Sequence, residues 1–243
     1  MTDFHTHLDL YADPICVARK ANESNAFTFC MTTSPRAWQM TTKVFSGLYR
    51  VGVGIGLHPE VLHTKLTEVP TLLDGIVRTR LIGEVGMDGS PQYRPYWLKQ
   101  REVFARTLQE CSRMGNRIVS VHSRRAVDAV LDVIESYAKN VAIVLHWFSG
   151  TKAQLERATS LGCYFSANPL MLQSLAGRKL FSALPRKRML LESDGPFATA
   201  QGQPIMPWGH YDLVRQYCGG IRFDEEDLFR CDQIAGDLLR GVQ

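Results

Sequence analysis

The feature that most constrains the fold of this chain is the repeated alternation of short apolar runs with longer amphipathic runs. The short runs have the length and composition of buried strands. In the segments between them, such as 96–114 and 125–137, apolar residues recur at helical spacing. Asp13-Pro14 and Ser34-Pro35 have the pattern of an N-cap followed by proline in the first helical turn. The eight strand-like runs are 2–7, 27–32, 51–57, 81–86, 118–122, 141–146, 163–167 and 189–194.

Alternation of strands and helices predicts an α/β fold with a parallel sheet. The chain has 243 residues, and a (β/α)₈ barrel typically needs about 250. Eight repeats at this length favour a closed barrel over an open doubly wound sheet. No G-x-G-x-x-G follows the first strand-like run, which weighs against a dinucleotide-binding fold. We therefore predict a (β/α)₈ TIM barrel in which residues 1–243 form a single domain.

Charge and cysteine usage restrict the function only loosely. The net charge of +4 is mild, so it neither requires nor excludes a nucleic-acid partner. The six cysteines form no C-x-x-C pair, which favours free thiols in a reducing compartment. The N-terminus has no signal-peptide pattern, and no run of about 18 apolar residues occurs. We therefore predict a cytoplasmic protein with no membrane partner.

Residues that commonly bind metal ions occur at the C-terminal ends of five predicted strands. In a barrel of this kind, the chemistry takes place at that end of the strands. His5 and His7 are two residues apart, so on a strand both side chains would point to the same face. The other candidates at strand ends are Glu84, His122, His146 and Asp194.

A single one of these histidines would more often be a core residue than a metal ligand. Four histidines and two carboxylates at matching strand ends are much harder to obtain by chance. Burying so many ionisable groups together is also costly unless a cation compensates. Imidazoles with carboxylates suit Mg²⁺, Mn²⁺ or Zn²⁺, and no thiolate is present to favour zinc.

Seven ordered motifs resemble those of the TatD family of metal-dependent deoxyribonucleases, and the similarity runs along nearly the whole chain. The motifs are Asp3-Phe4-His5-Thr6-His7-Leu8-Asp9, Gly56-Leu57-His58-Pro59, Ile82-Gly83-Glu84-Val85-Gly86-Met87-Asp88, Gln100-Arg101-Glu102-Val103-Phe104, Val121-His122-Ser123-Arg124, Leu145-His146-Trp147-Phe148-Ser149-Gly150 and Leu191-Glu192-Ser193-Asp194-Gly195-Pro196.

The resemblance implies two divalent metal ions, Mg²⁺, Mn²⁺ or Zn²⁺. By motif, His5, His7 and Asp194 would hold one ion, and His122 and His146 would hold the second. Glu84 would bridge the two ions and so act directly in catalysis. Asp194 would be both a ligand and the base that holds the attacking water. The implied reaction is the hydrolysis of phosphodiester bonds in DNA, as a 3′–5′ exonuclease.

A closer resemblance is to the TatD-like nucleases of bacterial Qat anti-phage systems. It rests on the segments 7–11 and 202–208 and on Trp147 after His146. It implies a role in defence with other Qat proteins as partners. An Arg-Asn-Glu-Pro stretch found in many TatD sequences is replaced here by Pro204-Ile205-Met206-Pro207. Asp88-Gly89-Ser90 likewise replaces the aspartate-tyrosine motif of the family. These departures affect the expected substrate preference rather than the metal ligands.

Arg124, His58 and Trp147 are the candidate substrate contacts. Arg124 follows His122 closely and could bind a phosphate. His58 could donate to a phosphate or simply pack a loop, and Trp147 could stack on a base or close the barrel mouth. The run Arg186-Lys187-Arg188 precedes the last strand, on the opposite face, and is expected to be solvated surface.

Two other functions fit the same residues. The first is hydrolysis of a different ester, such as aminoacyl-tRNA, because barrels of this type serve many substrates. The second is a scaffold subunit of a defence complex with a decayed site. The complete set of six candidate ligands argues against decay.

Overall fold

A computed structural model describes residues 1–241 and has the alternating element order that the sequence predicts. The strands are β1 Thr2–Thr6, β2 Phe27–Cys30, β3 Val51–Val53, β4 Leu81–Gly86, β5 Arg117–His122, β6 Val141–His146, β7 Tyr164–Ala167, β8 Met189–Leu191, β9 Thr199–Ala200 and β10 Gln203–Pro204. The α-helices are α1 Pro14–Ser24, α2 Pro35–Val44, α3 Leu62–Lys65, α4 Val69–Arg78, α5 Trp97–Met114, α6 Val127–Tyr137, α7 Lys152–Ser160, α8 Leu175–Ala183, α9 His210–Tyr217 and α10 Glu225–Arg240. Short 3₁₀ helices are η1 Leu8–Leu10, η2 Leu66–Glu68, η3 Pro91–Tyr96, η4 Pro169–Gln173 and η5 Arg186–Arg188.

The described residues form two compact units that interleave along the chain. The first unit contains Met1–Cys30, Val44–Gly52 and the chain from Phe165 onward. The second contains Met31–Lys43 and Val53–Tyr164. Each unit has its own parallel strands and its own buried apolar residues. That residues 1–243 form a single domain stays a prediction.

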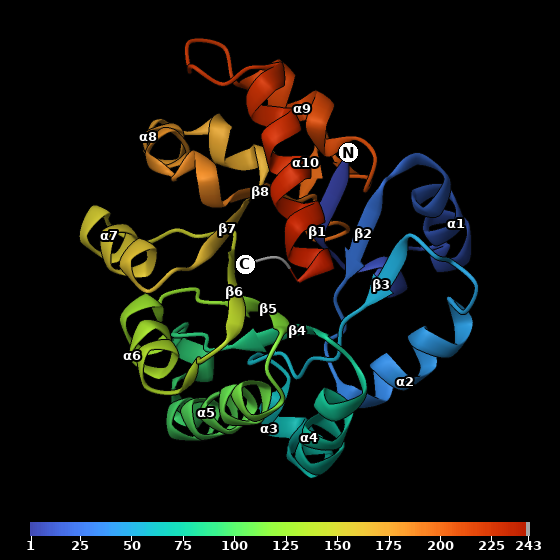
Figure 1. Cartoon of the computed structure of the whole chain (residues 1–243), viewed down its shortest axis with the longest axis vertical. Coiled ribbons are helices and arrows are strands. Elements are labelled where there is room, and N and C mark those ends of the chain that lie inside the picture. Colours follow the sequence, from blue (N-terminus) through green and yellow to red (C-terminus); the bar gives the residue numbers. More distant parts are fainter. Residues whose placement is uncertain (242–243) are drawn as a thin grey trace. The chain divides into compact units, whose positions relative to one another are not determined.

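In the second unit, β4, β5 and β6 pair in parallel and in chain order. The sheet is extended by an isolated bridge between Ile55 and Ile82. Helix α5 packs against α4 and α6 and against β4 and β5, and Figure 1 shows these helices along one side of the strands. The register of β4 against β5 shifts between Ile82 and Val85, on either side of Glu84. The irregularity therefore falls at a predicted metal ligand.

In the first unit, β1 pairs in parallel with β2, and β7 pairs in parallel with β8. The small antiparallel pair of β9 and β10 follows β8. Helix α10 packs against β1 and β8. Asp224 caps the start of α10 through a capping box with Asp227.

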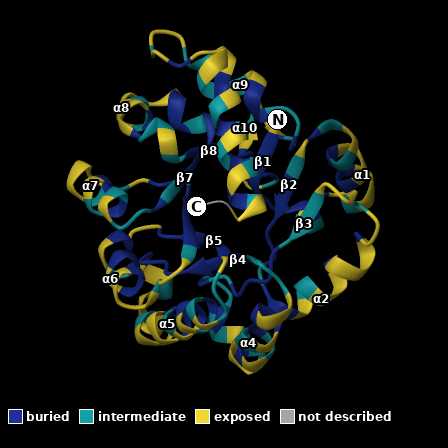
Figure 2. Cartoon of the chain, viewed as in Figure 1, coloured by how far each residue is buried: buried dark blue, intermediate teal, exposed yellow. Residues whose placement is uncertain are grey.

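Most strand residues are buried, although β3 is only half-buried and β9 and β10 each have an exposed residue, and the helices expose one face, as Figure 2 shows. On α6, Val130, Leu131 and Ile134 are buried, which confirms the helical spacing seen in the sequence. This helix begins at Val127 rather than at the predicted 125, because Arg125 has a positive φ of 53°. Asp13 caps α1 as predicted, with its side chain accepting from the Cys16 N–H.

Several predicted strands are too long at their C-terminal ends. β1 ends at Thr6 and not at residue 7, β2 ends at Cys30, and β8 ends at Leu191 and not at residue 194. β3 ends at Val53, although residues up to 57 are apolar. The chain leaves the ladder at these points because other hydrogen bonds take over. The Asp194 N–H, for example, donates to the His5 carbonyl at 2.9 Å.

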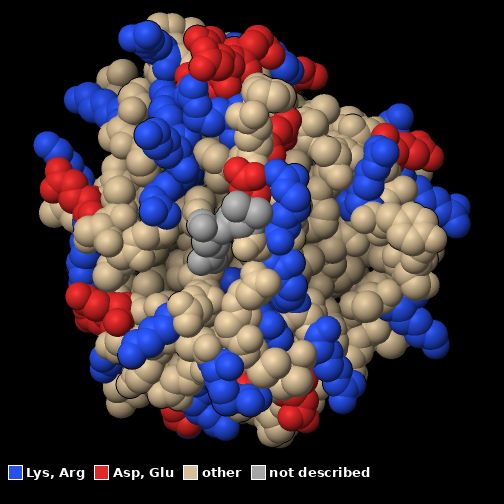
Figure 3. Space-filling model, in the orientation of Figure 1, with Lys and Arg blue, Asp and Glu red and all other residues tan. Residues whose placement is uncertain are grey.

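The run Arg186-Lys187-Arg188 is not simply solvated surface, so that expectation is wrong for Arg186. Its guanidinium lies 4.7 Å from the ring centroid of Phe223 and donates to the Arg222 carbonyl at 2.9 Å. Lys187 is exposed, in agreement with the expectation. Figure 3 shows separate groups of basic side chains on the drawn face, and acidic side chains at the top where α10 begins.

The described cysteines are free thiols, as predicted. Cys30, Cys111, Cys163 and Cys231 are buried, and burial raises the pKa of Cys111 to about 12. No helix among residues 1–241 has the length and apolar character needed to cross a membrane.

His210 makes stability depend on pH in the mildly acidic range. It is fully buried at the start of α9, and its Nε2 donates to the Thr2 carbonyl at 3.0 Å. Burial lowers its pKa from 6.5 to about 4, although Asp232 opposes the shift. The folded protein therefore binds fewer protons than the unfolded chain between pH 6.5 and 4, so stability falls as the pH drops through this window.

We expect His210 to cost about 2 kcal/mol of stability between pH 7 and pH 5. Urea unfolding of the wild type and of His210→Gln at both pH values measures this cost. Glutamine keeps an N–H donor but does not titrate, so the stability gap between the two proteins should narrow by that amount at pH 5. A gap that stays constant would show that His210 does not titrate in this range.

Candidate metal centre

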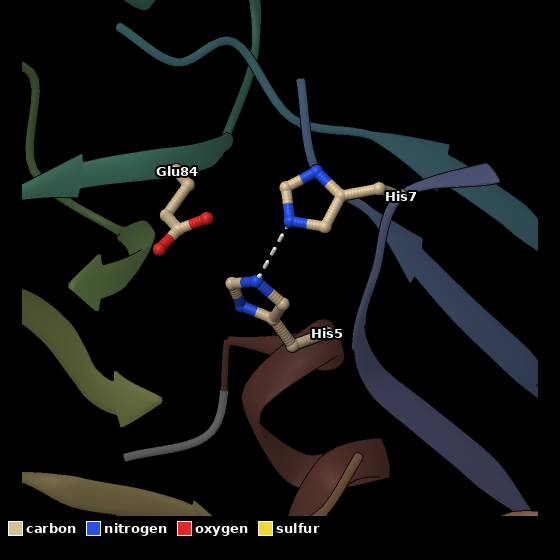
Figure 4. Close-up of side chains that lie close together, drawn as sticks. All are labelled: His5, His7 and Glu84. Carbon is tan, nitrogen blue, oxygen red and sulfur yellow. Dashed lines mark hydrogen bonds between the residues drawn. The ribbon is translucent and has the colours of Figure 1, made fainter. Parts of the chain in front are cut away.

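In the first unit, His5, His7 and Asp194 converge at the C-terminal ends of β1 and β8. The Nε2 atoms of His5 and His7 lie 3.4 Å apart, and a dashed line joins them in Figure 4. Asp194 Oδ1 lies 3.6 Å from His5 Nε2 and 3.8 Å from His7 Nε2. All three side chains are at least nine-tenths buried. Glu84, also drawn in Figure 4, belongs to the second unit and is described with it.

Backbone hydrogen bonds hold this group of side chains in place. The Asp194 N–H donates to the His5 carbonyl, and the Gly195 carbonyl accepts from the His7 N–H at 2.8 Å. The Thr6 hydroxyl donates to the same Gly195 carbonyl at 3.1 Å. Asp194 itself has a positive φ of 49°. Aspartate tolerates this left-handed conformation better than most residues, and such outliers often occur at functional sites.

Asp3 helps to hold the same group of residues in place through hydrogen bonds to its carboxylate. Its carboxylate accepts from the His5 N–H at 3.2 Å and from both the N–H and the hydroxyl of Ser193, at 3.0 and 2.6 Å. Burial raises the pKa of Asp3 to about 8, although these hydrogen bonds oppose the shift. Asp3 thus joins the residue beside Asp194 to the backbone of His5. The sequence contains one indication of this supporting role, because Asp3 is a carboxylate within the predicted buried strand 2–7.

In the second unit, Glu84 at the end of β4 is the centre of a histidine cluster. Its Oε1 lies 2.8 Å from His122 Nδ1, 3.2 Å from His58 Nε2 and 3.5 Å from His146 Nε2. Glu84 and His122 are buried, and His146 is nine-tenths buried. Three elements supply the strand-end residues, because parallel strands β4, β5 and β6 end at the same edge.

A second carboxylate, Asp88, holds the far side of the His122 ring. His122 Nε2 donates to Asp88 Oδ2 at 2.8 Å, while its Nδ1 donates to Glu84. Burial alone would lower the pKa of His122, but Asp88 and Glu84 raise it to about 10. Burial alone would raise the pKa of Asp88, but the hydrogen bonds from His122 and from the Ser90 N–H, the latter at 2.7 Å, hold it well below the usual range.

Both clusters have donor sets that suit a divalent cation. Two imidazole nitrogens bound to one tetrahedral zinc at about 2.0–2.1 Å lie roughly 3.4 Å apart. The separation of His5 Nε2 and His7 Nε2 matches this value. In the second unit, ligand atoms of His58, Glu84 and His122 lie within 4.8 Å of one another, as do those of Glu60, Asp88 and His122. Nitrogen and oxygen donors without sulfur suit Zn²⁺, Mn²⁺ or Mg²⁺.

The predicted substrate contacts have different environments. Arg124 is exposed just after β5, where it is available to a ligand. Trp147 is half-buried after β6 and has a positive φ of 38°, which is a rare conformation for a bulky residue. His58 lies beside Glu84 and edge-to-face with His122, and its contact with substrate stays a prediction. Its position is that of a further nitrogen donor.

Comparisons with known proteins identify the family of this chain. A family model described as "TatD related DNase" matches residues 2–229. Human "Deoxyribonuclease TATDN3" is 27% identical over 216 residues, which cover 81% of this chain and 78% of that protein. The "3'-5' ssDNA/RNA exonuclease TatD" of Edwardsiella piscicida is 26% identical over 149 residues, which cover 58% of this chain and 56% of that protein.

A solved structure of the TatD homologue YJJV from Escherichia coli superposes with a TM-score of 0.80 at 22% sequence identity. The match covers 99% of this chain and 95% of that one, so it confirms the predicted α/β fold. The family match extends over almost the entire sequence and includes every strand that carries a candidate ligand. The chain belongs to the TatD-related DNase family and is a metal-dependent hydrolase of that family.

Proposed function

We propose that this chain is a nuclease that hydrolyses phosphodiester bonds of DNA from the 3′ end with two divalent metal ions. The observation that carries the proposal is the presence of two buried clusters of histidines and carboxylates at strand ends in a member of a DNase family. The names of the human and Edwardsiella relatives support DNA as the substrate and a 3′–5′ direction.

In this proposal, His5, His7 and Asp194 would hold one ion, His122 and His146 would hold the other, and Glu84 would be the carboxylate that both ions share. When bound, such ions supply Lewis-acid stabilisation of phosphoryl charge and a hydroxide nucleophile near neutral pH. The nearness of Glu84 Oε1 to both His122 and His146 supports its place beside their ion. His58 lies near enough to Glu84 to orient that carboxylate.

Asp194 is the residue best placed to accept a proton from the attacking water. Its carboxylate is mostly buried, and its backbone is fixed by the hydrogen bond to His5. A fixed carboxylate can orient a water molecule at hydrogen-bond distance and take its proton. Asp88 does not need to titrate in this scheme, because it serves to hold the ring of His122.

A nuclease assay with different divalent metal ions tests the proposal. The protein, stripped of metal and then supplied with Mg²⁺, Mn²⁺ or Zn²⁺, is incubated with end-labelled single- and double-stranded DNA, with RNA and with aminoacyl-tRNA. We expect metal-dependent shortening of DNA from the 3′ end and two bound ions per chain by elemental analysis. Cleavage of the aminoacyl ester without DNA cleavage would replace the nuclease with a deacylase. If elemental analysis finds at most one bound ion per chain at saturating metal, Glu84 cannot bridge two ions.

Arg124→Ala tests the expected phosphate contact. The loss of one cation should weaken binding of single-stranded DNA and reduce the slope of log K against log salt by about 0.7. Fluorescence anisotropy over a salt series measures both effects. The matched control is Lys187→Ala, since Lys187 is also exposed but lies in η5 at the N-terminal end of β8. A control that weakens binding more than Arg124→Ala would place the DNA on the other face.

We further propose that the enzyme acts in the cytoplasm in anti-phage defence, together with other Qat proteins. The support is the resemblance carried by the segments 7–11 and 202–208 and by Trp147. Plaque assays on cells that carry the complete set of Qat genes test this role. Protection that persists when this chain carries Asp194→Asn would show that its nuclease activity is not needed for defence.

A further inference from the structure

Phe197 is an exposed aromatic residue immediately beside a candidate metal cluster. It is 63% exposed, although it lies only three positions after Asp194. Its ring centroid lies 4.9 Å from that of His7, at an interplanar angle of 82°. Exposure alone is ordinary for a single apolar residue, but an aromatic ring beside candidate metal ligands can provide a stacking surface for a base.

The exposure of Phe197 does not arise from a loosely held backbone. The Ala198 N–H donates to the Asp194 carbonyl at 2.9 Å, and the Ile205 N–H donates to the Ala198 carbonyl at 2.9 Å. Ala198 and Ile205 are both buried. The Tyr11 hydroxyl donates to the Ile205 carbonyl at 2.6 Å, which ties this segment to the start of the chain. Phe197 is therefore presented to solvent by a fixed turn.

The position relative to His7 limits what Phe197 can bind. The edge-to-face contact with His7 fixes the ring while most of the side chain stays accessible. A group stacked on Phe197 would lie next to the cluster of His5, His7 and Asp194. In a nucleic acid that is hydrolysed there, this group is the base of the nucleotide nearest the scissile phosphate.

We propose that Phe197 is a substrate-positioning residue that stacks on the terminal base of a single-stranded nucleic acid. The inference rests on the proposed nuclease function, and it identifies the terminal base as the part of the substrate that Phe197 contacts. Stacking on an aromatic ring tolerates every base, because each base has a π-face. A terminal base is free to stack in this way only when it is unpaired.

The experiment compares Phe197→Ala with wild type on two oligodeoxynucleotides that differ only at the 3′ end. One ends in an ordinary nucleotide and the other in a tetrahydrofuran residue without a base. We expect Phe197→Ala to lower kcat/KM on the ordinary end roughly 5- to 150-fold, mainly through KM. On the end without a base, the two proteins should act equally. Phe197→Trp should restore the rate on the ordinary end.

A matched control and a binding measurement exclude a purely structural effect. Phe229→Ala removes a phenylalanine of nearly equal exposure, 62%, from α10 and should leave both rates unchanged. In the Asp194→Asn background, a 3′-terminal 2-aminopurine should be quenched by binding when Phe197 is present and not when it is alanine. Elemental analysis should give the same metal content with and without Phe197.

The outcomes separate this inference from the proposed function. Equal losses on both ends, or lower metal content, would show that Phe197 acts through His7, and would overturn the stacking role. Unchanged rates on both ends would overturn it as well. A wild-type protein that binds its metals but degrades neither DNA nor RNA would overturn the proposed function and this inference with it.

Discussion

Replacing Glu84 with glutamine is expected to lower nuclease activity by at least about 10²-fold, the order of loss seen when one electrostatic stabiliser is removed from an active site. Glu84 Oε1 faces three imidazoles at 2.8 to 3.5 Å. Glutamine keeps the shape but replaces one oxygen with an NH₂ group, which cannot bind a cation. A bridge between two ions needs both oxygens, so the variant should lose or displace one ion. Initial rates and elemental analysis on the same preparations measure both effects.

The fold of Glu84→Gln should survive, because the glutamine carbonyl can still accept the hydrogen bond from His122 Nδ1. The far-UV circular dichroism spectrum should therefore equal that of the wild type. Glu102→Gln is the matched control, since Glu102 lies exposed on α5. Asp194→Asn measures any contaminating nuclease. Near-wild-type cleavage by Glu84→Gln above this background would contradict the two-metal proposal.

The parts of the fold that follow from hydrophobic pattern were predictable from the sequence. The bounds of β4 and β6 agree with the predicted 81–86 and 141–146, because buried parallel strands are short apolar runs between polar segments. The helical faces of α5 and α6 also follow from spacing alone. These elements are set by local sequence and by burial, and both can be read from the order of residues.

The ends of strands that present site residues were not predictable in the same way. The stretch 189–194 reads as one strand, yet β8 ends at Leu191 and Asp194 has a positive φ. The cause is the hydrogen bond from the Asp194 N–H to His5, a residue far away in sequence. Local propensity cannot report a bond of this kind, so tertiary context overrides it.

The side-chain contacts of several singled-out residues were likewise not predictable from the sequence. The motif containing His58 was visible, but its approach to Glu84 within 3.2 Å depends on the path of the chain after β3. Asp88 follows the Glu84 motif in sequence, but its hydrogen bond to His122 Nε2 depends on the pairing of β4 with β5. A run of charged residues predicts solvated side chains, but the contact of Arg186 with Phe223 depends on a later segment of the chain.

Gly56→Ala is expected to reduce stability and activity together, in contrast to Glu84→Gln. Gly56 is buried next to Ile55, and a Cβ there would lie under 3.0 Å from the backbone of both Thr32 and Glu84. The Glu84 N–H donates to the Thr32 carbonyl at 3.2 Å, so an added methyl group would force this hydrogen bond apart. Overpacking of this kind typically costs about 1–3 kcal/mol. Because no side chain can rotate away, the Glu84 backbone itself must move.

Urea unfolding and initial rates on the same preparations test this expectation. Gly219→Ala is the matched control, because a Cβ at the exposed Gly219 would meet nothing within 4 Å. We expect the control to keep wild-type stability and activity. Gly56→Ala should unfold at lower urea and cleave DNA more slowly even at concentrations where it is fully folded, since Glu84 no longer reaches its partners. Wild-type stability in Gly56→Ala would contradict the expected clash between the added Cβ and the backbone of Thr32 and Glu84. Lower stability with full activity in the folded protein would instead show that Glu84 need not be held this tightly by Thr32 and Gly56.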